Sequence, residues 1–134
     1  MLYPMFVLVL ITFTVLLLTL RVRISSVRKG NIDLNYFQLM QGNEVPDIVT
    51  KTTRQVSNLF EVPVLFYVGG LLYISLELSS TFPVACAWGF VVARVLHTGI
   101  HLSYNNVLHR VAVFGLGNLC VLAMWISIVM AVAD

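Results

Sequence analysis

The sequence predicts an all-α membrane protein, a bundle of four transmembrane helices. Of its 134 residues, 59% are hydrophobic and 10% are charged, whereas a soluble domain carries about 25% charged residues. The apolar residues gather in four stretches, each close to the roughly 20 residues with which a helix crosses a bilayer core. These stretches leave no room for a separate soluble domain, so we expect one four-helix domain over residues 1–134.

The first helix is predicted over residues 2–22. Its apolar run from Met1 to Leu20 contains no charged residue and is followed by Arg21 and Arg23. A secretory signal peptide has its positive charge before the apolar run and a small-residue cleavage site after it. The order of charges here is the reverse, which favours a transmembrane helix.

A polar connection is expected over residues 24–53, and it includes Gly42 and Asn43. Connections of this length are usually functional or disordered. Its middle part, Asn35 to Met40, is apolar enough to lie against the membrane surface or pack under the bundle. Asp47 is a candidate N-cap for the amphipathic first turns of the next helix.

The three remaining helices are predicted over residues 54–78, 82–104 and 107–133. Pro63 falls inside the second helix, which a bundle tolerates because neighbouring groups satisfy the freed carbonyls. Cys86 and Cys120 lie in apolar segments and are expected to be small buried hydrophobic residues, with no metal site. The net charge of +2 is too small to suggest a nucleic-acid partner.

The basic residues predict the orientation in the membrane. Six of them lie in or beside the first connection and Arg110 lies at the third, whereas the turn between the second and third helices has none. Cytoplasmic loops carry an excess of Lys and Arg. Both termini are therefore expected on the non-cytoplasmic side.

The third predicted helix places Arg94, His97 and His101 at i, i+3 and i+7, which is one face of a helix. A guanidinium at membrane depth costs roughly 2.5–3.5 kcal/mol on insertion scales, so Arg94 needs a partner. One interpretation is a packing ion pair with Glu61, which is expected at a similar depth. The other is a binding site.

The predicted topology brings most of the unusual polar groups to one end. Five arginines gather there, and one carboxylate, Glu61, cannot neutralise them all. Excess positive charge removed from water favours an anionic ligand, and the planar arginine fork suits carboxylates. Headgroup anchoring is the alternative for Arg21 and Arg23, packing is the alternative for His97, and His109 is expected at the interface. The five arginines are Arg21, Arg23, Arg54, Arg94 and Arg110.

Three stretches carry a resemblance to a known family. They are RVR at residues 21–23, RQVSNLFE at residues 54–61, and ARVLHTGIHL at residues 93–102 with Arg110 nine residues after His101. The second is similar to R-x-x-x-N-x-x-E and the third to R-V-x-H-T-x-x-Y. With these spacings the chain resembles the MAPEG family, the membrane-associated proteins in eicosanoid and glutathione metabolism.

The resemblance implies a homotrimer that binds glutathione between adjacent subunits near the cytoplasmic face. A lipophilic electrophile, hydroperoxide or lipid would be the second ligand, reached through the membrane lipids. Arg110, with Arg94 as the rival, would stabilise the thiolate and so be the catalytic residue. The expected glutathione contacts are Arg21, Arg54, Asn58, Glu61, Arg94, His97, His101 and Arg110.

The chain departs from the family pattern at three positions. His101 stands where the family has tyrosine, Leu59 where an acidic residue often follows the asparagine, and Val111 where some prostaglandin synthases have serine. From the resemblance we expect a glutathione-dependent membrane transferase or peroxidase. Because of the departures we keep a non-catalytic lipid- or glutathione-binding scaffold as the alternative. A small transporter is a third hypothesis, disfavoured because four short spans show no broken-helix repeats.

Overall fold

The computed structural model describes residues 1–41 and 44–133. Within them, four helical stretches are long and apolar enough to cross a membrane, which confirms the predicted integral membrane protein. Gly42 and Asn43 of the predicted connection, and Asp134, lie outside the described residues. The helices are α1 (Leu2–Arg28), α2 (Tyr36–Leu39), α3 (Asp47–Phe60), α4 (Val62–Ser75), α5 (Thr81–Leu102) and α6 (Val107–Ala133).

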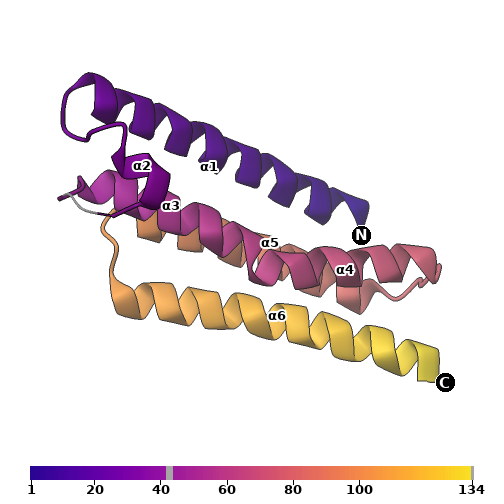
Figure 1. The fold of residues 1–134 in the computed structure, drawn as a ribbon. Coiled ribbons are helices and arrows are strands. Elements are labelled where there is room, and N and C mark those ends of the chain that lie inside the picture. Colours follow the sequence, from indigo (N-terminus) through magenta and orange to yellow (C-terminus); the bar gives the residue numbers. More distant parts are fainter. Residues whose placement is uncertain (42–43, 134) are drawn as a thin grey trace.

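The long helices run side by side and antiparallel (Figure 1). α1 packs mainly on α3, and α5 lies between α1 and α3 on one side and α6 on the other. α6 packs closely on α5 and more lightly on α4. The N-terminus and the end of α6 lie at one end of the bundle, and the α1–α3 connection and the α5–α6 turn lie at the other (Figure 1). We call the latter the loop end.

Two features at the loop end differ from the prediction. α1 continues to Arg28, where residue 22 was the expected end. The amphipathic turns expected after Asp47 are present, but they form the separate helix α3, in which Asp47 is the first residue and Pro46 is the N-cap. Arg23 explains part of the added order, because its Nη2 donates to Thr53 Oγ1 at 3.0 Å. Its guanidinium also lies 5.4 Å from the centre of the Phe37 ring in α2. Arg23 thus connects α1, α2 and α3.

The predicted single helix over residues 54–78 is also wrong, because it is broken at Glu61. This residue has φ −90° and ψ −98°, outside the helical region, and joins α3 to α4. Pro63 is the cause: its ring would clash with the carbonyl four residues earlier, and it has no N–H to donate. Pro63 instead occupies the first turn of α4, where no donor is needed.

The core is apolar toward the end opposite the loop end. Leu8, Phe66, Phe90 and Met124 are fully buried, and the Phe66 and Phe90 rings lie 4.9 Å apart between centroids. Close approach of α4 and α6 depends on Gly69, because a Cβ there would lie 2.6 Å from Met124 Cε and 3.1 Å from Trp125 Nε1.

We expect Gly69→Ala to destabilise the protein by about 1–3 kcal/mol, the usual cost of overpacking. Met124 can turn its methyl group away, but Trp125 is held by the hydrogen bond from its Nε1 to Leu65 O at 3.0 Å. Thermal unfolding in detergent micelles would measure the loss. Gly99→Ala is the matched control, since a Cβ at Gly99 would meet nothing within 4 Å. Equal melting temperatures for the two variants would contradict this account of the α4–α6 contact.

Candidate functional site

The polar face predicted for the third span is buried in the bundle. Arg94, His97 and His101 of α5 are 2%, 3% and 1% exposed. The aromatic ring of Phe114, from α6, lies 5.7 Å from the His97 ring, and the His97 and His101 rings stack with centroids 5.9 Å apart. Polar groups buried to this degree are normally hydrogen-bonded. Side-chain nitrogens on this face that have no hydrogen-bond partner among the described residues are therefore candidates for contact with a ligand.

Arg94 is a buried cation without a protein acceptor. Its Nε, Nη1 and Nη2 atoms find no hydrogen-bond partner among residues 1–41 and 44–133. The guanidinium instead lies between two aromatic rings, 5.1 Å from the centres of Phe90 and Phe114. The direct ion pair with Glu61, one of the two interpretations of Arg94, is therefore not formed among the described residues. Glu61 is exposed, because the break between α3 and α4 falls on it.

Arg110 is connected to His101 through Asn105. Asn105 Oδ1 accepts a hydrogen bond from Arg110 Nη1 at 2.8 Å and lies 2.9 Å from His101 Nδ1. Asn105 has a left-handed backbone, φ 53°, in the turn between α5 and α6. Arg110 Nε and His101 Nε2 remain buried without partners among the described residues. Asn106 caps the start of α6 by accepting the His109 N–H at 3.1 Å.

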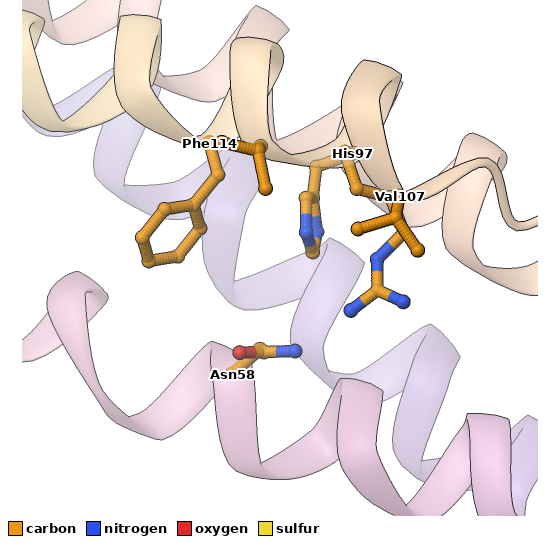
Figure 2. Close-up of a pocket in the computed structure, with 6 residues that line it drawn as sticks. Asn58, His97, Val107 and Phe114 are labelled. Carbon is orange, nitrogen blue, oxygen red and sulfur yellow. The ribbon is translucent and has the colours of Figure 1, made fainter.

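A cavity of about 210 Å³ opens between α3, α5 and α6. Asn58 projects from α3 toward His97, while Val107 and Phe114 border the cavity from α6 (Figure 2). Arg110 is also part of its lining, together with Val111. The structure therefore brings three of the predicted site residues to one cavity: Asn58, His97 and Arg110.

A second, smaller cavity of about 150 Å³ lies at the loop end and contains two further predicted residues, Arg54 and His101. Its other lining residues are polar as well: Asp47, Thr50, Lys51 and Asn105. The stacked His97 and His101 rings each border one of the two cavities. The hydrogen bond between Arg110 and Asn105 also joins a residue of one lining to a residue of the other.

Arg21 does not join this group within one chain. It is exposed and lines a different hollow of about 350 Å³, formed by α1 and the connection that follows it. Ser25, Ser26 and Lys29 lie in the same lining. Glu61 lines neither cavity around the two histidines.

Two polar residues of the site were missed by the sequence reasoning. Gln55 is fully buried, and its Nε2 donates to Thr98 Oγ1 at 2.6 Å; Thr98 Oγ1 in turn donates to Arg94 O at 2.8 Å. The signal was the i, i+3, i+7 spacing of Thr52, Gln55 and Leu59, which are all buried on α3. Asn105 lies between the third and fourth predicted helices and follows His101 by four positions, a helical spacing that was the signal for their contact.

An apolar cavity of about 480 Å³ lies farther along the bundle, between α4 and α6. Leu65, Val121 and Trp125 are among its lining residues. Asn118 is polar in this lining, and its Oδ1 is buried with no hydrogen-bond partner among the described residues. The arrangement offers an apolar ligand a surface with one acceptor.

Of three comparisons with known proteins, one places the chain in a family. Searches of curated proteins and of solved structures returned no match. A family model, described as the MAPEG family, matches residues 1–130 of the chain. Because this match covers almost the whole sequence, the protein belongs to the MAPEG family.

Proposed function

We propose that the protein is a glutathione-dependent membrane transferase or peroxidase that acts on lipophilic electrophiles or hydroperoxides. The observation that carries the proposal is the buried guanidinium of Arg94, whose three nitrogens find no acceptor among residues 1–41 and 44–133. A buried charge is normally paired. Arg110 lines the cavity together with Phe114, whose ring packs against the Arg94 guanidinium. Two cations in this region favour a ligand that brings anionic oxygens and a thiolate, and glutathione fits both this requirement and the family.

Arg110 is the better candidate for the catalytic arginine. It lines the 210 Å³ cavity, whereas Arg94 does not, and its Nε has no partner among the described residues. A nearby cation stabilises a thiolate, which is the reactive nucleophile. The thiol would lose its proton to solvent, the sulfur would form a bond to the electrophilic carbon, and the leaving group would depart with the electron pair. Arg94, whose guanidinium packs against the Phe114 ring in the cavity lining, would add to the positive electrostatic potential at the cavity.

A homotrimer would complete the site. The 210 Å³ cavity is smaller than the roughly 300–1,000 Å³ of typical small-molecule pockets, so one chain alone encloses too little space. Arg21, which lies apart from this cavity, would reach glutathione bound by a neighbouring subunit. We further propose that the loop end, which carries most basic residues, faces the cytoplasm, with both termini on the other side.

The test combines binding and chemistry on the purified protein in lipid nanodiscs. Saturating glutathione is expected to raise the melting temperature, since a ligand at 100 times its Kd stabilises the folded state by about 2.7 kcal/mol. Thiolate absorbance should rise on binding, and conjugation should follow with lipophilic electrophiles. S-methylglutathione is the matched control, because it cannot form a thiolate.

A non-catalytic scaffold is the second candidate, favoured by one observation. His101 and Val111 replace the tyrosine and serine of the family pattern, and both border the cavities of this site. A scaffold would bind glutathione or a lipid with a clear thermal shift and leave it unaltered. If glutathione binds without forming a thiolate, and no conjugation is detected with several electrophiles, the scaffold therefore replaces the enzyme as the proposed function.

A further inference from the structure

The protonation of the His101 ring is fixed by its neighbours. Asn105 uses one side-chain atom, Oδ1, to face both Arg110 Nη1 at 2.8 Å and His101 Nδ1 at 2.9 Å. A guanidinium can only donate hydrogen bonds, so the asparagine atom that faces it must be the oxygen and not the amide nitrogen. An oxygen that accepts from Arg110 also accepts from His101, which requires the proton on Nδ1.

The other ring nitrogen is then an acceptor. A neutral imidazole carries one proton, so a proton on Nδ1 leaves a lone pair on Nε2. Nε2 is buried and has no partner among the described residues, and His101 as a whole is 1% exposed. A buried acceptor without a donor destabilises the protein. A ligand that brings a donor to this point would remove that cost.

The surroundings of His101 indicate which donor fits. The 150 Å³ cavity that it borders combines further acceptors, the Asp47 carboxylate and the Thr50 hydroxyl, with two cations, Lys51 and Arg54. An α-amino acid group carries an ammonium that donates and a carboxylate that accepts. The charges of the lining match the two ends of such a zwitterion.

We propose that His101 is an obligate hydrogen-bond acceptor that selects a ligand with a free α-ammonium group at this cavity. The inference rests on the proposed function, in which the ligand is glutathione, and it assigns the ammonium to His101 and Asp47 instead of the expected Glu61. A tyrosine hydroxyl at this position would both donate and accept, so it would discriminate less. His101 thus acts as a specificity residue that depends on Asn105.

The first experiment reads the ring directly. The full-length protein is labelled with ¹⁵N-histidine in nanodiscs, and the His101 signals are assigned by their absence in His101→Gln. We expect Nδ1 to be protonated and Nε2 unprotonated without ligand. Adding glutathione should shift the Nε2 signal toward that of a hydrogen-bonded acceptor. A protonated Nε2 in the ligand-free neutral ring would overturn the proposal. The decisive measurement is made on the wild type, and the His101→Gln spectrum serves only to assign its signals.

The second experiment separates this proposal from the proposed function. Calorimetry compares glutathione with N-acetylglutathione, which lacks the ammonium. The wild type should lose about tenfold or more in affinity on acetylation, the range expected for a hydrogen bond to a charged group. The ratio of the affinity for glutathione to that for N-acetylglutathione should be smaller in His101→Tyr, which introduces the family residue. The ratio of Asn105→Leu should lie between those of the wild type and His101→Tyr.

The outcomes are distinguishable. If the wild type binds neither compound, the proposed function fails. If glutathione binds but the ratio is the same in the wild type and in His101→Tyr, only the role of His101 is overturned. Tyr104→Phe serves as the matched control, because Tyr104 is an exposed neighbour whose hydroxyl contacts only the His109 side chain. Its ratio should equal that of the wild type.

Discussion

Arg110→Ala is expected to lower glutathione-dependent turnover by about 100- to 1,000-fold, the usual loss when one donor to a developing anion is removed. Arg110 lines the cavity at the point where α6 begins, and it has an unused Nε for the thiolate. The loss should fall mainly on kcat, and the thiolate absorbance of bound glutathione should disappear with it. Steady-state kinetics and difference spectroscopy would measure both.

Two controls make this result specific. Arg28→Ala removes an exposed arginine at the end of α1 and should leave turnover unchanged. Arg110→Lys keeps the charge but loses the fork geometry, so it should recover only part of the thiolate signal. A normal thiolate signal in Arg110→Ala would transfer the catalytic role to Arg94.

Arg94→Met is expected to stabilise the ligand-free protein while abolishing its response to glutathione. Replacing a buried charge by an apolar residue of similar volume is often stabilising, by about 1–4 kcal/mol, and Arg94 has no hydrogen-bond partner to lose among the described residues. The methionine would retain contact with Phe90 and Phe114. Thermal unfolding with and without glutathione measures both effects. The ligand-free variant should melt at a higher temperature than the ligand-free wild type, and adding glutathione should not raise the melting temperature of the variant further.

The opposite result would be equally informative. A lower melting temperature of ligand-free Arg94→Met would show that the guanidinium is already paired, for example by a carboxylate of a neighbouring subunit. Arg94→Lys is the matched variant. It keeps the buried charge without the planar fork, and so it should gain no stability in the absence of ligand.

The sequence predicted the four spans well because apolar length is a local property. Both ends of two spans agree with the prediction within two residues: α5 covers residues 81–102 and α6 covers residues 107–133. Besides the break at Glu61, the errors occurred at the loop end, where tertiary contacts decide. The Arg23 to Thr53 hydrogen bond joins residues that are 30 positions apart, and no periodicity within residues 24–53 indicates it.

The site shows the same division between local and distant effects. The shared face of Arg94, His97 and His101 followed from helical spacing and was found buried. A direct pairing of Arg94 with Glu61 was one of two interpretations, and it assumed a straight second helix. The break at Glu61 removes that premise, and no such contact forms among the described residues. The connection of Arg110 to His101 runs through Asn105, a turn residue with a left-handed backbone, and spacing alone does not reveal that conformation.

The apolar cavity between α4 and α6 has a consequence for how the proposed reaction would be measured. Its walls, which include Val62, Leu122 and Trp125, belong to membrane-spanning helices. A lipophilic substrate that enters there is drawn from the bilayer, so its effective concentration is a mole fraction in lipid and not a concentration in water. Adding empty vesicles at constant total substrate would then dilute that substrate in two dimensions and slow the reaction, although nothing in the aqueous phase had changed.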